Sequence, residues 1–77
     1  MSKSTVAKHS VYIEGQKTSI SLEDVFWDAL GEIANEQSWT RKDLLEQVDL
    51  QREGNLSSAL RVFALQYYRT QASRSRK

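Results

Sequence analysis

The side chains that could carry out catalysis or hold a metal ion are few and scattered in this sequence. Cysteine is absent and His9 is the only histidine, so disulfides and thiolate zinc sites are excluded, and no carboxylates cluster near His9. No set of nucleophile, base and orienting acid can be recognised, and no glycine-rich loop is present to hold a phosphate. The sequence therefore predicts no enzyme, no metal and no cofactor.

The remaining candidates for chemistry are the charged residues, which are unevenly distributed. The net charge is +1, but residues 1–21 carry three lysines against one glutamate, residues 22–53 carry nine acids against three basic residues, and residues 54–77 carry five basic residues and no acid. Two basic ends around an acidic middle can form a local surface that faces phosphates. The alternative is that the terminal charges only keep the protein soluble, and charge alone favours this alternative.

The length of the chain indicates that a partner completes its core. Seventy-seven residues make one small domain, which buries only roughly 60% of the surface that its unfolded form exposes. Without disulfides or a metal, oligomerisation is the expected source of further burial. No apolar run approaches the roughly 20 residues that cross a bilayer, and residues 1–10 lack the apolar segment of a secretory signal. We therefore expect a cytoplasmic protein without membrane contact.

Residues 10–22, SVYIEGQKTSISL, have the composition and alternation of a β-hairpin. Gly15 followed by Gln16 is the signature of a two-residue type II′ turn. Pairing outward from this turn gives Glu14 with Lys17, Ile13 with Thr18, Tyr12 with Ser19, Val11 with Ile20 and Ser10 with Ser21. One face is then apolar (Val11, Ile13, Thr18, Ile20, Leu22) and the other polar (Ser10, Tyr12, Glu14, Lys17, Ser19, Ser21).

Three amphipathic helices are predicted after the hairpin, at about residues 23–37, 40–51 and 56–69. Ser21 or Glu23 is the candidate cap of the first helix, and Thr40 with Asp43 forms a capping box for the second. Residues 10–69 are the predicted domain, between a flexible N-terminus at residues 1–9 and a disordered basic tail at residues 70–77. The predicted fold class is mainly α-helical with a short N-terminal β-hairpin.

The segment KTSISL is a predicted strand that runs directly into an amphipathic helix. A turn follows, and then a second helix that is capped by a hydroxyl residue. This order of elements resembles the ribbon-helix-helix class of Arc/MetJ-type bacterial repressors. More closely, KTSISLEDVFWDAL and GNLSSALRVFALQYYR resemble short bacterial ribbon-helix-helix proteins of unassigned role, over about residues 10–69. The resemblance implies an intertwined homodimer with an additional C-terminal helix. Each chain would give one strand to an antiparallel ribbon that enters the major groove of double-stranded DNA.

The resemblance also implies which residues contact DNA. Carried over by position, the base-facing residues are Lys17, Ser19 and Ser21, and the phosphate-binding residues are Thr40, Arg41 and Lys42 at the start of the second helix. Lysine can donate to guanine acceptors, a serine hydroxyl can donate and accept, and a helix N-terminus binds phosphate. The alternative for the strand residues is an ordinary solvated sheet face, and Thr40 is first of all a helix cap.

Three features depart from the simplest pattern of the family. The extra strand at residues 10–14 implies a four-stranded sheet in the dimer, serine gives weaker base contacts than arginine or asparagine, and Glu14 and Glu23 would repel nearby phosphates. Two functions are therefore weighed. The first is a transcriptional regulator that binds a palindromic operator. The second is a dimeric protein-interaction module, an adaptor or antitoxin-like protein with a protein partner and weak or no specific DNA binding.

Overall fold

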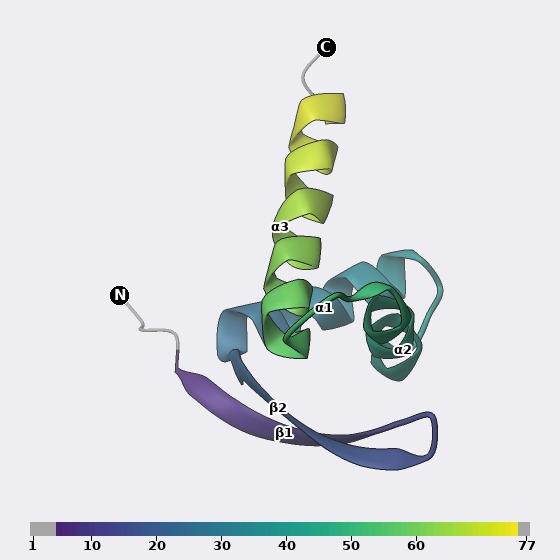
Figure 1. The fold of residues 1–77 in the computed structure, drawn as a ribbon. Helices are drawn as coiled ribbons and strands as arrows, with labels where there is room; N and C mark the ends of the chain where they lie inside the picture. Colours follow the sequence, from purple (N-terminus) through teal and green to yellow (C-terminus); the bar gives the residue numbers. More distant parts are fainter. Residues whose placement is uncertain (1–4, 76–77) are drawn as a thin grey trace.

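The computed structural model describes residues 5–75, which form a β-hairpin followed by three α-helices. The strands are β1 (Val6–Ile13) and β2 (Gln16–Glu23), and the helices are α1 (Asp24–Glu36), α2 (Arg41–Gln51) and α3 (Leu56–Ser75). The hairpin lies across one end of the molecule with the helices on one of its faces, and α3 extends away from it (Figure 1). The predicted fold class and the order of elements are confirmed, with α3 as the additional helix.

The hairpin turn is formed by Glu14 and Gly15, one residue earlier than predicted. Both residues have a positive φ, 52° for Glu14 and 82° for Gly15, and this combination is what a type I′ turn requires. The predicted type II′ turn at Gly15-Gln16 is wrong, because Gln16 is the first residue of β2 and pairs with Ile13.

The different turn shifts the cross-strand register by two residues but keeps both faces of the hairpin. Val11 pairs with Thr18 instead of Ile20, and Ser10 pairs with Ser19 instead of Ser21. Side chains alternate between the faces with a period of two, so a two-residue shift leaves every side chain on its predicted face. The division into an apolar and a polar face therefore survives the error in the turn.

The strand β1 begins at Val6, so residues 6–9 belong to the hairpin and not to the flexible N-terminus that the sequence predicts. Val6 pairs with Glu23, which makes β1 and β2 match along their whole length. The backbone N–H of Asp24 also donates to the carbonyl of Thr5 at 2.9 Å. None of residues 6–9 is fully buried, which fits their weak hydropathy signal. Residues 1–4 lie outside the described part of the chain.

The helix α3 runs to Ser75, whereas the predicted helix ends at residue 69 and gives way to a disordered tail. Residues 68–73 are all exposed, so no apolar periodicity marks them as helical. Nothing in residues 56–75 is a glycine or proline, and extending an existing helix costs less than starting one. Residues 70–75 are therefore helical, and residues 76–77 lie outside the described range.

One hydrophobic core joins the hairpin to all three helices. Its largest fully buried side chains come from β2, α1, α2 and α3; they are Ile20, Leu22, Leu30, Ile33, Leu44, Leu45 and Leu60. Because the inner face of the hairpin is packed on the helices, its outer face is left to solvent. Over residues 5–75, no helix is long and apolar enough to cross a membrane.

Candidate nucleic-acid interface

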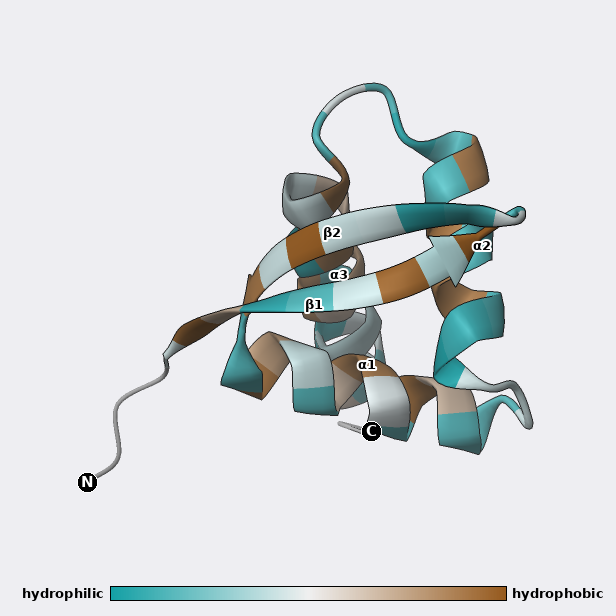
Figure 2. Cartoon of the chain, turned by 90° about the horizontal axis from the view of Figure 1, so that it is seen from below, coloured by the Kyte–Doolittle hydropathy of each residue, from teal (hydrophilic) through white to brown (hydrophobic). Residues whose placement is uncertain are grey.

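The outer face of the hairpin is polar and basic over three cross-strand pairs, and the Val6–Glu23 pair lies beyond them at the end of the strands. The cross-strand pairs are Lys8 with Ser21, Ser10 with Ser19, and Tyr12 with Lys17. All six side chains are exposed, and Figure 2 shows this side of the hairpin in front of the helices. The structure thus brings the predicted base-facing residues Lys17, Ser19 and Ser21 together on β2 and sets residues of β1 beside them.

Sequence reasoning missed the contribution of β1 to this face. It assigned Ser10 and Tyr12 to the polar face without a role, and Lys8 to the flexible N-terminus. The alternation of residues 6–13 contains the missing signal, because Val11 and Ile13 turn toward the helices and even-numbered residues must then turn away. Extending this alternation two residues further toward the N-terminus would have placed Lys8 on the outer face.

The outer-face side chains are free to meet a ligand. Within residues 5–75, none of the six makes a hydrogen bond or an ion pair with another side chain. Exposed lysine ammonium groups are donors only, while serine hydroxyls both donate and accept. These are groups that can bond to the base edges of a major groove.

The inner face of the hairpin holds the outer face in position. Ile20 and Leu22 are 1% and 0% exposed. On β1, the His9 ring stacks on Trp27 of α1 with a centroid distance of 3.9 Å and an interplanar angle of 4°. Both strands are therefore fixed against the helices, and the outer-face side chains project from a rigid support.

Both ends of the hairpin are tied to helices through carboxylates. At the turn, the backbone N–H of Glu14 donates to Glu46 Oε2 at 3.2 Å, and Lys42 Nζ donates to the same oxygen at 3.0 Å. At the other end, Arg61 Nε donates to Glu23 Oε1 at 2.8 Å. The hydrogen bond from Lys42 lowers the pKa of Glu46, and that from Arg61 lowers the pKa of Glu23. The repulsion expected from Glu23 is thus balanced by Arg61.

The side chains at the start of α2 are used within the protein. Thr40 Oγ1 accepts from the Asp43 N–H at 3.1 Å, and Asp43 Oδ2 accepts from the Thr40 N–H at 3.1 Å, which confirms the predicted capping box. The hydrogen bond from the Thr40 N–H lowers the pKa of Asp43. The backbone N–H groups of Arg41 and Lys42 have no acceptor in the described chain, as expected for the first turn of a helix.

Arg41, the first residue of α2, is folded onto α1. Its Cζ lies 4.6 Å from the centroid of the Trp27 ring, in the geometry of a cation–π contact. Its guanidinium also lies against Gly31, where an added methyl group would overlap Nη2 of Arg41. Arg41 Nε is buried and has no hydrogen-bond partner among the described residues. The predicted phosphate-binding residues thus share one helix end, but the Arg41 side chain points to α1.

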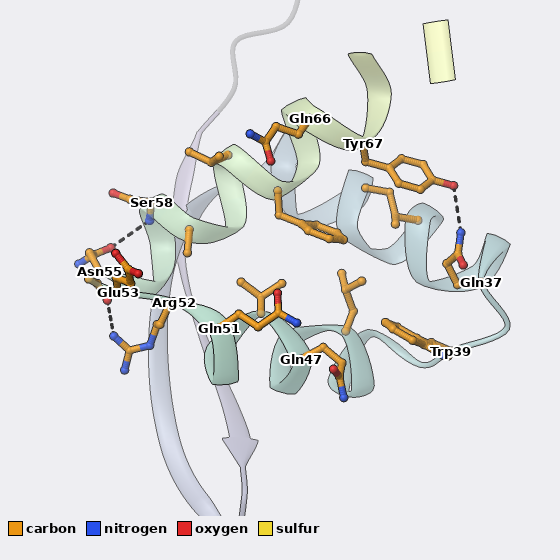
Figure 3. Close-up of a pocket in the computed structure, with 17 residues that line it drawn as sticks. Gln37, Trp39, Gln47, Gln51, Arg52, Glu53, Asn55, Ser58, Gln66 and Tyr67 are labelled. Atoms are coloured by element: carbon orange, nitrogen blue, oxygen red, sulfur yellow. Dashed lines mark hydrogen bonds between the residues drawn. The ribbon is translucent and has the colours of Figure 1, made fainter. Parts of the chain in front are cut away.

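A groove of about 860 Å³ lies between α2 and α3, away from the outer face of the hairpin (Figure 3). Its lining includes the apolar side chains of Ile33, Leu44, Val48, Val62 and Phe63. Polar side chains surround them, and the labelled ones include Gln37, Gln47, Gln51, Gln66 and Tyr67. Trp39 and Val62 are 43% and 52% exposed, so the groove leaves large apolar groups open to solvent.

The hairpin, whose outer face is free and basic, is thus continued by one helix and packed on a second, capped helix. The family model described as a ribbon-helix-helix domain matches residues 6–68. The chain belongs to this family, and the resemblance noted in its sequence is confirmed. Domains of this family are in general non-enzymatic DNA-binding regulators that bind DNA as dimers. No curated protein and no solved structure matches the chain.

Proposed function

We propose that this chain is a DNA-binding transcriptional regulator, a cytoplasmic homodimeric repressor that inserts a two-stranded antiparallel ribbon into the major groove. The outer face of the hairpin carries the proposal. Over three of its cross-strand pairs, the six side chains are exposed, include two lysines and no acid, and have no partner within residues 5–75. A two-stranded ribbon fits a major groove about 12 Å wide. Membership in a family of DNA-binding domains supports DNA as the ligand.

Lys17, Ser19 and Ser21 are the proposed base contacts on β2. Residues two apart on a strand are separated by about 6.8 Å, which is close to two base-pair steps of about 3.4 Å. Lysine can donate to O6 and N7 of guanine, whereas a serine hydroxyl accepts or donates and discriminates less between bases. The sequence preference of this strand should therefore depend mainly on Lys17.

The proposed phosphate contact is the start of α2, at Thr40, Arg41 and Lys42. The free backbone N–H groups of Arg41 and Lys42 lie at the positive end of the helix dipole, where an anion is stabilised. Thr40 caps this end, and the ammonium group of Lys42 adds positive charge. Arg41 would have to leave Trp27 to reach a phosphate, so the backbone groups support this contact more strongly than the Arg41 side chain.

Two features support the proposal of a homodimer. The groove between α2 and α3 leaves Trp39 and Val62 open to solvent, and a second chain would cover them. The sheet also contains only the two strands β1 and β2 in the described chain, so each strand keeps one unpaired backbone edge. A symmetric dimer would bind an operator with matching two-fold symmetry.

The test is a selection of random DNA duplexes by the purified protein at low and at near-physiological salt. We expect enrichment of a two-fold symmetric motif that persists at the higher salt. On the selected duplex, Lys17→Ala should weaken binding about 10-fold, since it removes one base contact. Arg69→Ala is the matched control, because it removes one positive charge from an exposed position on the part of α3 that extends away from the hairpin. Equal affinity of Lys17→Ala and wild type would contradict the proposal.

The groove between α2 and α3 favours a second candidate function, a dimeric protein-interaction module of the adaptor or antitoxin type. Its apolar lining could accept a helix or an extended segment of another protein. This candidate predicts that the selection enriches no motif and that DNA binding disappears at near-physiological salt, as expected of purely electrostatic attraction.

A further inference from the structure

The strand β1 carries a basic side chain that the base contacts proposed for β2 do not use. Lys8 lies on the outer face of the hairpin, opposite Ser21. Its side chain is exposed and has no partner within residues 5–75. Its backbone is held in the ladder with β2, and the adjacent His9 ring stacks on Trp27 of α1. Lys8 is therefore a free cation on a fixed strand.

The two strands of the hairpin lie against different helices. The strand β1 packs against α2, whereas β2 packs against α1 and α3. Trp27 links β1 to the start of α2, because it contacts both the His9 ring and the Arg41 guanidinium. In Figure 2, β1 lies on the α1 side of β2. The strand β1 and the start of α2 therefore belong to one flank of the protein.

The width of the major groove decides what each strand can reach. In the proposed ribbon, β2 pairs through its free edge with β2 of a second chain, so β1 becomes the outer strand of a four-stranded sheet. At about 4.8 Å between strands, β2 lies about 2.4 Å and β1 about 7.2 Å from the centre of this sheet. A groove about 12 Å wide has its edges about 6 Å from its centre. The strand β2 thus fits inside the groove, and β1 lies at its edge, where the sugar–phosphate backbone runs.

We propose that Lys8 binds a phosphate of the DNA backbone at the edge of the major groove, on the same flank as the start of α2. The inference rests on the proposed function and deepens it, because β1 then contributes affinity while β2 contacts the bases. A lysine ammonium group suits this role, since it is a compact charge on a flexible stem and a common phosphate ligand.

The other charged groups of this flank are already paired within the chain. Lys42 binds Glu46 at 3.0 Å, and Arg41 lies over Trp27. Glu23, which follows Ser21 on the outer face, is bound by Arg61 at 2.8 Å. Among these groups, the Lys8 ammonium is the one that can bind a phosphate without breaking an internal contact.

A phosphate contact and a base contact differ in how they affect binding. A phosphate contact positions the protein on any sequence and does not distinguish bases. It also releases counterions, so the logarithm of the association constant falls with the logarithm of the salt concentration, with a slope of about −0.9 per phosphate. A dimer contains two copies of Lys8, which should therefore account for about 1.8 of this slope.

The test measures the DNA affinity of the wild type, Lys8→Ala and Lys17→Ala over a range of salt concentrations. Each protein is measured on the duplex that the wild type selects and on a duplex of unrelated sequence. We expect Lys8→Ala to weaken binding to both duplexes by the same factor and to make the salt slope shallower by about 1.8. Lys17→Ala should weaken binding to the selected duplex more than to the unrelated one.

Two results of this comparison would overturn the inference. The first is an equal salt slope for Lys8→Ala and the wild type. The second is a loss of affinity in Lys8→Ala that is confined to the selected duplex, because Lys8 would then contact a base. Both results leave the proposed function intact. Failure of the wild type to select any motif is a different result, because it removes the proposed function and this inference together.

Two further variants control for charge. Lys8→Arg keeps the positive charge and should keep the salt slope of the wild type. Arg69→Ala removes one charge from an exposed position on the part of α3 that extends away from the hairpin (Figure 1), and it should leave the slope unchanged. A change in Arg69→Ala as large as that in Lys8→Ala would overturn the inference, because net charge alone would then explain the effect. Circular dichroism of each variant should match that of the wild type, since both positions are exposed.

Discussion

The outer face of the hairpin and the start of α2 are both proposed to contact DNA, yet their groups are used in opposite ways. In the hairpin, the backbone groups that point toward the neighbouring strand are paired in the ladder, and the six outer-face side chains have no partner within residues 5–75. At the start of α2, Thr40 caps the helix, Lys42 binds Glu46, and Arg41 lies over Trp27. There the backbone N–H groups of Arg41 and Lys42 are the ones left free.

This difference assigns different tasks to two sets of residues that look alike in the sequence. Each set contains lysine and hydroxyl side chains, but only free side chains can distinguish one base edge from another. Free backbone N–H groups can hold a phosphate and set the orientation of the protein on the duplex. The hairpin should therefore determine which sequence is bound, and α2 should determine how the protein is placed on it.

The largest effect is expected from a change on the inner face of the hairpin, which supports the free outer face. Leu22 is 0% exposed, so Leu22→Asp buries an unpaired carboxylate and should cost more than about 4 kcal/mol, enough to unfold a small domain. Ile20→Asp should behave in the same way. Thermal unfolding followed by circular dichroism measures the loss.

The neighbouring residue on the outer face provides the control for Leu22→Asp. Ser21→Asp introduces the same charge at an exposed position and should change stability by less than about 0.5 kcal/mol, while it weakens DNA binding by repelling phosphates. A folded Leu22→Asp protein, or an unfolded Ser21→Asp protein, would show that the two faces of the hairpin do not divide stability and binding between them.

A smaller effect is expected at the turn that aligns the outer face. Gly15 has a φ of 82°, so Gly15→Ala should destabilise the protein by about 1 kcal/mol, because a side chain is strained in this region. Gly54→Ala is the matched control, since its added methyl group would meet no atom within 4 Å and its φ is not in the left-handed region. Denaturant unfolding should separate the two variants, and equal stabilities would contradict the assigned role of Gly15.

The elements that could be predicted from the sequence are those specified by local patterns. Apolar spacing marked the three helices, and Thr40 with Asp43 marked the start of α2. The turn could not be settled in this way, because Gly15 satisfies a type II′ turn in one register and a type I′ turn in the other. The observed register places Glu14 in an unfavourable left-handed conformation, but it pairs all eight residues of β1 with β2.

The candidate site was predicted only where its residues lie close together in the sequence. Lys17, Ser19 and Ser21 share a face because they alternate along one strand. Lys8 joins them only through the register of the hairpin, and the contact of Arg41 with Trp27 and Gly31 depends on how α2 packs on α1. Such contacts are tertiary, so no local pattern in the sequence could indicate that the Arg41 side chain is already occupied.

An effect on stability no larger than that of Gly15→Ala is expected at the start of α2, together with little change in DNA binding. Thr40→Ala removes the acceptor of the Asp43 N–H and should cost about 1 kcal/mol, whereas Thr40→Ser keeps the hydroxyl and should cost less. Denaturant unfolding at neutral pH measures both variants. DNA affinity of the folded protein should stay within about 2-fold, since the backbone N–H groups remain in place; a larger loss would mean that the Thr40 side chain itself holds the phosphate.

The same helix end also makes stability depend on pH. In the folded state the pKa of Asp43 lies below its ordinary value of 3.8, chiefly because its carboxylate accepts the hydrogen bond from the Thr40 N–H. Its contribution is therefore complete above the unfolded pKa and is lost as the pH falls through the folded pKa. Glu23 and Glu46, whose pKa values are also lowered, act in the same direction. Asp43→Asn should consequently lose less stability than the wild type between about pH 5 and pH 3, and equal losses would show that the capping carboxylate does not contribute to acid sensitivity.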